Sequence, residues 1–97
     1  MHIAVGRLEI HLPMSRSLKD RRQVAQSLCT RISARFNVAV AEEGGDNRRQ
    51  GLTLVLAVVA NDPDQARDVL ESVANFVEES RPDLAVLAMS TEVLSGV

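Results

Sequence analysis

The sequence predicts a two-layered α+β fold, in which two helices cover one face of a four-stranded antiparallel sheet. Three observations carry this prediction: strand-like alternation near the start of the chain, two helical segments of similar length, and apolar strand segments after each helix. The resulting order, β-α-β-β-α-β, is that of ferredoxin-like domains. With 97 residues the chain has room for one domain, which we assign to residues 1–97.

The first predicted strand covers residues 3–12 and alternates between the two sides of a sheet. Leu8, Ile10 and Leu12 point to one side, and the polar side chains between them point to the other. The proline that follows ends the strand, because proline has no amide donor for the sheet. Gly6 indicates a bend or a close approach of another segment.

A helix over residues 18–35 is predicted by a capping box and an apolar stripe. Ser17 and Asp20 have the spacing at which a hydroxyl accepts a hydrogen bond from the amide three residues later. Seven side chains fall within one arc of this helix: Leu18, Val24, Ala25, Leu28, Cys29, Ile32 and Phe36. Cys29 is the lone cysteine, and its place in the stripe favours a small core residue over a nucleophile.

The middle of the chain predicts a hairpin. Residues 38–41 form a short apolar strand, and residues 42–51 (EEGGDNRRQG) form a polar, glycine-rich loop. Residues 52–60 (LTLVLAVVA) are apolar on both faces, which is typical of a central strand that is covered on both sides.

The second helix has the clearest signals in the chain. Asp62 is the expected N-cap, Pro63 stands at the first helical position, and Gln65 completes a variant capping box. Apolar residues recur at helical spacing to about residue 80. The last strand is predicted over residues 84–94.

This topology leaves one face of the sheet uncovered. Right-handed crossovers put both helices on the same face and predict that the first and third strands form a parallel centre. On the opposite face the third strand presents Val55, Ala57 and Val59 beside Arg7 and Glu9. An apolar patch rimmed by charge usually marks an interface, and a symmetric dimer is its commonest use.

Charge is distributed unevenly along the chain. The net charge is −2, which argues against a general polyanion binder, yet residues 1–50 carry nine cations and five anions. Lys19, Arg21 and Arg22 stand in the first turn of the first helix, where cations oppose the helix dipole. Two explanations are open. One is ion pairing with Asp62, Asp64 and Asp68 at the start of the second helix, and the other is a bound anion such as RNA phosphate.

Nucleotide and base-stacking sites have little support. The glycine-rich loop matches neither the dinucleotide-binding nor the P-loop pattern, and it lies between strands instead of before a helix. Arg48 and Arg49 on its descending arm are candidates for anion contact. Phe36 and Phe76, the two aromatic residues, are both assigned to helices, so bases are not expected to stack on the sheet.

Catalysis is not expected, and neither is a cofactor or a metal. His2 is almost terminal and His11 lies at the outer end of a strand, so both are interpreted as solvated. The sequence has no His or Cys spacing of a metal site, and no activated nucleophile for a small-ligand or acyl-phosphate enzyme can be named. The longest apolar run, residues 54–60, is too short to span a membrane, and the start lacks signal-peptide character. We therefore expect a cytoplasmic protein.

Four segments resemble the YlxP-like family of small bacterial proteins of unknown function: HLP at 11–13, SLKDRR at 17–22, RFNVAVAE at 35–42 and LAVVAND at 56–62. The resemblance covers nearly the whole chain. It implies a ferredoxin-like fold, dimerisation and no established enzyme activity. Genes of the family often neighbour those for transcription termination, translation initiation and ribosome maturation factors, which implies an RNA- or ribosome-linked role. Relatives commonly carry an aromatic residue in the hairpin loop, where this chain has Arg49.

Two functional hypotheses follow. The first is a non-catalytic accessory factor that docks on RNA or a ribonucleoprotein through basic side chains: Lys19, Arg21, Arg22, Arg48 and Arg49. The alternative is a homodimeric interaction or structural module that binds no nucleic acid and uses the open-face residues Val55, Ala57 and Val59. Neither hypothesis predicts a DNA or membrane partner.

Overall fold

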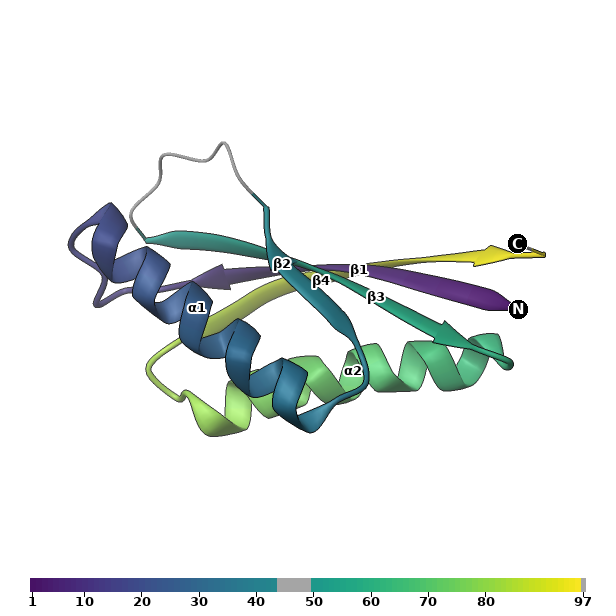
Figure 1. Ribbon diagram of the computed structural model, residues 1–97. Coiled ribbons are helices and arrows are strands. Elements are labelled where there is room, and N and C mark those ends of the chain that lie inside the picture. Colours follow the sequence, from purple (N-terminus) through teal and green to yellow (C-terminus); the bar gives the residue numbers. More distant parts are fainter. Residues whose placement is uncertain (44–49, 97) are drawn as a thin grey trace.

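A sheet and two helices account for most of the chain in the computed structural model, which describes residues 1–43 and 50–96 (Figure 1). The elements in chain order are β1 (His2–His11), α1 (Leu18–Arg35), β2 (Ala39–Glu42), β3 (Gly51–Ala60), α2 (Pro63–Ser80) and β4 (Ala85–Ser95). The predicted β-α-β-β-α-β order is confirmed. The strands β2 and β4 each begin one residue later than the sequence predicts.

The sheet has the strand order β2-β3-β1-β4, and every neighbouring pair is antiparallel. The predicted antiparallel sheet with β1 and β3 at its centre is confirmed, but the prediction that these two strands are parallel is wrong. Each helix connects two strands that have a third strand between them: β3 lies between β1 and β2, and β1 lies between β3 and β4. The parallel pairs are therefore not adjacent.

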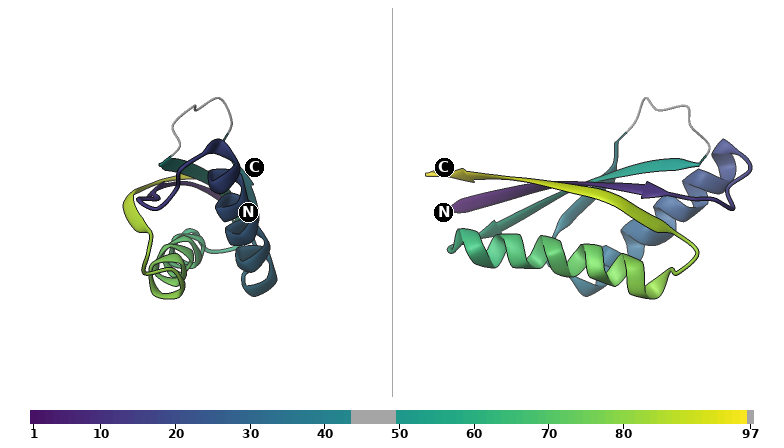
Figure 2. Two further views of the ribbon diagram at one scale, coloured as in Figure 1. Left: turned by 90° about the vertical axis from the view of Figure 1, so that its left-hand side faces the viewer. Right: turned by 180° about the vertical axis from the view of Figure 1, so that it is seen from behind.

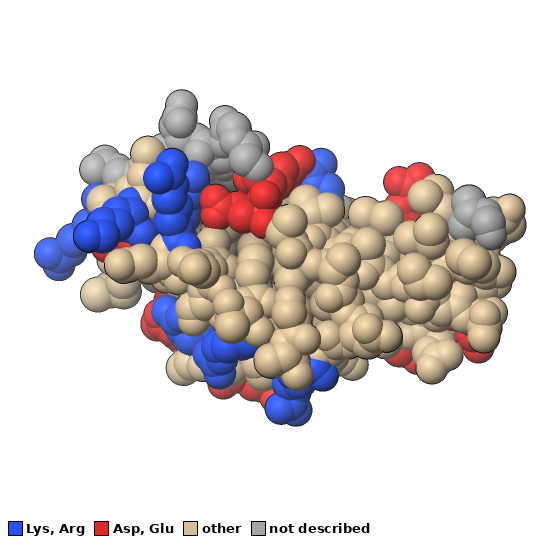
Figure 3. Space-filling model, in the orientation of Figure 1, with Lys and Arg blue, Asp and Glu red and all other residues tan. Residues whose placement is uncertain are grey.

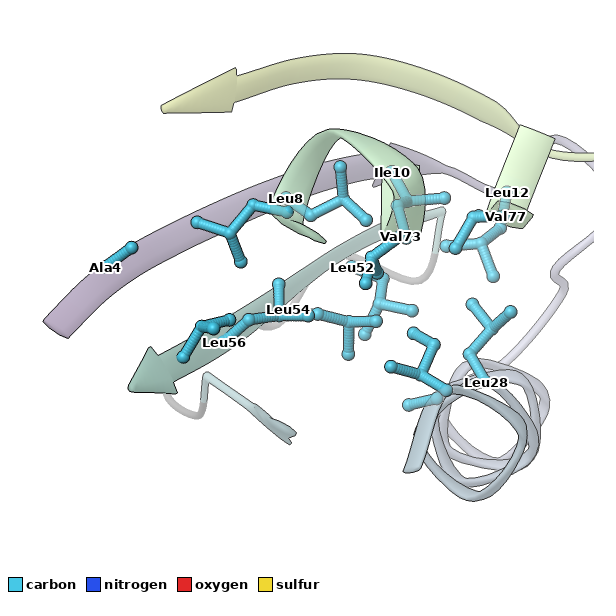
Figure 4. Close-up of a cluster of buried hydrophobic side chains, with 14 of the residues drawn as sticks. Ala4, Leu8, Ile10, Leu12, Leu28, Leu52, Leu54, Leu56, Val73 and Val77 are labelled. Atoms are coloured by element: carbon cyan, nitrogen blue, oxygen red, sulfur yellow. The ribbon is translucent and has the colours of Figure 1, made fainter. Parts of the chain in front are cut away.

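Both helices lie on one face of the sheet, and the other face is open (Figure 2). The helix α2 packs on β1, β3 and β4, whereas α1 packs on β2 and β3. The core lies between the two layers and is made almost entirely of aliphatic side chains, including Leu8, Leu54 and Leu70 (Figure 4). Within the described residues, no helix is long and apolar enough to cross a membrane.

The helix starts confirm the predicted caps with one difference. The Ser17 hydroxyl accepts from the Asp20 amide at 3.1 Å, but the Asp20 carboxylate accepts from the Arg16 amide at 2.9 Å, one residue before the cap. In α2 the Asp62 side chain accepts from the Asp64 amide at 2.9 Å. Both helices therefore begin where the sequence predicts, because side-chain oxygens satisfy amides of the first turn.

Gly6 is a point of close approach, as predicted. A Cβ atom at this position would lie 3.0 Å from Cε of Met89 and 3.2 Å from Cδ1 of Leu70. The missing side chain lets α2 lie close to the centre of the sheet.

Candidate functional site

The open face of the sheet carries an apolar patch. In an antiparallel pair, residues opposite each other point to the same side, and β3 is paired with β1 so that Val59 lies opposite Ile3 and Ala57 opposite Val5. Alternate residues of the same strands, such as Leu54 and Leu56, are buried under the helices. Val55, Ala57 and Val59 therefore point outward, as the sequence predicts.

The patch is larger than the sequence reasoning recognised. On β4, Leu94 lies opposite Ile3, and on β2 two alanines lie opposite Ala57 and Val55. We define the open-face patch as Ile3, Val5, Val55, Ala57, Val59 and Leu94. Val59 is 64% exposed and Leu94 is 45% exposed. The alternation of β1 contained the signal for Ile3 and Val5, but only the strand register brings them beside β3 and β4.

Charged residues lie beside this patch along the strands. Arg7 of β1 is opposite Val55, and its guanidinium forms an ion pair with the carboxylate of Glu43, which follows β2. This contact crosses β3. Glu9 is exposed two residues further along β1. The predicted apolar patch with a charged rim is therefore present, and the end of the molecule that carries the two termini shows mostly uncharged side chains (Figure 3).

The basic start of α1 is divided between solvent and interior. Lys19 and Arg22 are exposed, whereas Arg21 is only 8% exposed and reaches Glu42, with 3.8 Å between Nη2 and Oε1. Glu42 lies opposite Leu54, so its side chain is on the helix-covered face. The side chain of Arg21 therefore points under α1. The candidates for binding an anion that face solvent at this end of the helix are Lys19 and Arg22.

The acidic start of α2 does not balance these cations. The two helices begin at opposite ends of the sheet and run in opposite directions (Figure 1). Asp62 caps its own helix, and Asp64 pairs with Arg67 at 3.0 Å. The explanation by ion pairs between the two helix starts is therefore wrong. The strands that lead into the helices, β1 and β3, are antiparallel, so the two helices start at opposite ends of the sheet. Arg48 and Arg49 lie outside the described residues.

Both histidines are half-buried and hydrogen-bonded, in contrast to the prediction that they are solvated. Nδ1 of His2 lies 2.8 Å from the Ser95 hydroxyl. Nδ1 of His11 donates to the backbone carbonyl of Gln50 at 3.0 Å. The first contact joins β1 to the end of β4, and the second joins β1 to the residue before β3. The described residues contain no group of three or more potential metal ligands.

Cys29 packs against the core, as its place in the apolar stripe predicts. Burial raises the pKa of its thiol, and the nearby Glu42 carboxylate raises it further. Both causes favour the neutral thiol, which is a poor nucleophile.

A hollow of about 220 Å³ lies between the start of α1 and the connection from α2 to β4. Leu12, Val24 and Leu84 contribute to its apolar part. At its polar part Arg81 donates two hydrogen bonds to Asp83, at 3.0 and 2.9 Å, and they lower the pKa of that carboxyl. Arg81 and Asp83 are therefore paired with each other, and the carboxylate of Asp20, which also lines the hollow, accepts from the Arg16 amide.

The two aromatic rings meet in the helix layer, away from the open face. Phe36, which ends α1, packs edge-to-face on Phe76 of α2, with 5.6 Å between ring centroids. Arg31 and Arg35 stack on these rings, and we call the four residues the Arg–Phe cluster. Sequence reasoning assigned both rings to helices but missed the cluster, because its members meet only when α1 packs beside α2.

The chain is similar to proteins of unknown function. A family model described as "Protein of unknown function (DUF503)" matches residues 3–91. The chain is 30% identical over 76 residues to "Uncharacterized protein YlxP" of Bacillus subtilis (strain 168), which covers 78% of this chain and 82% of that protein.

Two designed proteins share the fold at low sequence identity. One is the de novo designed protein Foldit4, with a TM-score of 0.55 and 7% identity, and all of each chain is covered. The other is the de novo designed protein LFR1 1 with ferredoxin fold, with a TM-score of 0.57 and 11% identity over all of this chain and 88% of that one. These structures support a ferredoxin-like architecture.

Proposed function

Since the chain belongs to the DUF503 family of proteins of unknown function, we propose a function from its surfaces. The protein acts as a non-catalytic interaction module, and its open sheet face binds a second copy of the same chain. The single observation that carries this proposal is the open-face patch, where Val59 and Leu94 are largely exposed on a face that the helices leave uncovered.

The dimensions of the face suit a dimer. The strands β1, β3 and β4 have 10, 10 and 11 residues and β2 has 4, and at about 3.3 Å per residue and about 4.8 Å between strands they give a face of roughly 550 Å² on each copy. This is just above the roughly 500 Å² per partner, or about 1,000 Å² in total, that a specific interface needs. The whole face, and not the apolar patch alone, is therefore needed.

The layout of the face also suits a twofold axis. The apolar patch gathers where β1 begins and β3 ends. Glu92 of the edge strand β4 lies beside it, opposite Val5, and Arg7, Glu9 and Glu43 lie further along the strands. A twofold axis through the patch places apolar side chains on apolar side chains and leaves the charges toward the rim. Dimer interfaces have this arrangement of apolar core and polar rim.

Sedimentation velocity tests the proposal. We expect the wild-type chain to sediment as a dimer at both low and high salt, because an apolar contact is little screened. Ala57→Asp places a charge at the centre of the patch and should give monomers. Ser72→Asp adds the same charge to the exposed side of α2 and should leave the dimer intact. An unaltered dimer for Ala57→Asp, or a wild-type chain that stays monomeric, would overturn the proposal.

A second candidate function is an RNA- or ribosome-associated accessory role, for which α1 provides the supporting observation. This helix carries five basic side chains and one acidic side chain, whereas α2 carries one basic and five acidic. Lys19 and Arg22 are exposed at its start, and basic side chains lie over both of its ends (Figure 3). Phosphate contacts need this kind of surface.

Salt dependence separates this candidate from self-association. Binding of a single-stranded oligoribonucleotide through Lys19 and Arg22 should weaken steeply as salt rises. The double variant Lys19→Gln/Arg22→Gln should lose most of the affinity, while Arg67→Gln on α2 should bind like the wild type. Unchanged binding by the double variant would exclude this end of α1 as the RNA contact.

A further inference from the structure

We propose that Arg31 and Arg35 of the Arg–Phe cluster form a binding site for a phosphate group, either free or carried as a terminal monoester. This site lies at the end of α1, remote from the open-face patch and from the start of the same helix. It goes beyond the proposed self-association and does not depend on it.

The two guanidinium groups are held in place by aromatic rings. Cζ of Arg31 lies 5.5 Å from the centroid of Phe76, and Cζ of Arg35 lies 5.1 Å from the same centroid and 6.0 Å from that of Phe36. The rings are half-buried, and their edge-to-face contact anchors them between the helices. A guanidinium that stacks flat on a ring keeps its N–H edges available for a ligand.

The end of the α1 dipole favours these two positive charges, but no carboxylate of the described residues pairs with them. Among the described residues, neither Arg31 nor Arg35 forms an ion pair or a hydrogen bond from its side chain, although both are exposed. They are one helical turn apart, at the i,i+4 spacing where like charges repel. Two other exposed arginines, Arg7 and Arg67, do pair with the carboxylates of Glu43 and Asp64. An anion bound between the two guanidinium groups would remove the repulsion.

Phosphate fits this arrangement better than a carboxylate does. A carboxylate offers two oxygens, which one guanidinium can bind in bidentate fashion. A phosphate monoester or free phosphate offers three or more acceptor oxygens and nearly two negative charges, so it can bridge both groups. The rigid fork of arginine is also suited to phosphate in a way that lysine is not.

NMR titration with inorganic phosphate tests the site. We expect saturable shifts of the Arg31 and Arg35 Nε–H signals and of the Phe76 ring, and no comparable shifts with acetate at equal ionic strength. The double variant Arg31→Gln/Arg35→Gln should weaken phosphate binding by about tenfold or more, the loss of about one good charged contact. The matched control Arg16→Gln/Arg67→Gln removes the same charge from two other exposed arginines and should bind within about twofold of the wild type.

The substitution Arg35→Lys keeps the charge and should still lose several-fold affinity, because the fork is lost. Equal shifts with acetate, shifts that do not saturate, or unchanged binding by the Arg31→Gln/Arg35→Gln variant would overturn the proposal.

Two further arms identify the source of the phosphate and separate the site from the dimer. An oligoribonucleotide with a 5′ phosphate that binds more tightly than the same oligomer without it would identify a nucleic-acid end. Inorganic phosphate that binds as tightly as the phosphorylated oligomer would identify free phosphate. The Ala57→Asp variant should bind phosphate like the wild type even if it is monomeric, so failure of one proposal is distinguishable from failure of the other.

Discussion

The two faces of the sheet are built from the same strands and have opposite properties. On the helix-covered face, β1 and β3 present mainly leucine and isoleucine, including Leu8, Leu54 and Leu56, which are fully buried. On the open face the same strands present smaller apolar residues and a few charges, including Val59 and Arg7. Long side chains reach across to the helices, whereas short ones leave a flat surface. The comparison indicates that the covered face supplies stability, and it leaves the open face available for the association that we propose.

The largest predicted difference between the faces is the cost of removing a side chain. Leu54→Ala removes a fully buried side chain beneath the helix layer and should lower the free energy of unfolding by about 2–5 kcal/mol. Val59→Ala on the open face should change it by less than about 0.5 kcal/mol in the monomer. Urea unfolding of both variants in the Ala57→Asp background, which we expect to be monomeric, measures the difference. Equal costs would show that the open face is also packed.

A second contrast lies within the first turn of α1. Arg21→Gln removes a buried cation that reaches Glu42, and we expect a loss of about 1–3 kcal/mol in unfolding free energy. Arg22→Gln changes its exposed neighbour and should cost less than about 0.5 kcal/mol. Urea unfolding at constant ionic strength compares the two. A larger cost for Arg22 would contradict the division of this turn between interior and solvent.

A third prediction concerns how closely the helices approach the covered face. Gly6→Ala adds a methyl group within 3.0 Å of Met89 Cε and 3.2 Å of Leu70 Cδ1, so one of these must move. We expect a loss of about 1 kcal/mol, because the neighbouring atoms are ends of side chains that can shift in part. The double variant Gly6→Ala/Met89→Ala should recover part of this loss relative to Met89→Ala alone. If no stability is recovered, the contact between position 6 and Met89 does not limit how closely α2 approaches the sheet.

The smallest effect is the alkaline dependence of stability from Cys29. Burial and Glu42 raise the pKa of this thiol in the folded protein. The stability that this proton provides is present below the unfolded pKa of about 8.5 and is lost as the pH rises above it. Unfolding free energies measured between neutral and alkaline pH should therefore fall more steeply for the wild type than for Cys29→Ala. Identical slopes would show that the thiol is not desolvated.

Most of the fold could be predicted from local pattern, and most of the site could not. The alternation of Leu8, Ile10 and Leu12 identifies one face of β1, and the residues Asp62 and Pro63 locate the start of α2 to the residue. The strand β3 is apolar on both faces, and the prediction that it is covered on both sides is wrong, because both helices lie on the same face of the sheet (Figure 2). Local patterns do not show that Ile3 and Leu94 extend the patch, because that depends on the register of β4. Nor do they show the partner of Arg21, which is 21 residues away in the chain.

The sequence by itself determined the elements, their order and the face that β1 buries, because periodicity and helix caps act over a few residues. Only the tertiary structure decided what meets across the fold: the antiparallel centre of the sheet, the contact of Arg21 with Glu42, and the gathering of two arginines on Phe76. These contacts join segments that are distant in sequence. They depend on the direction and register of packed elements, which no local pattern encodes.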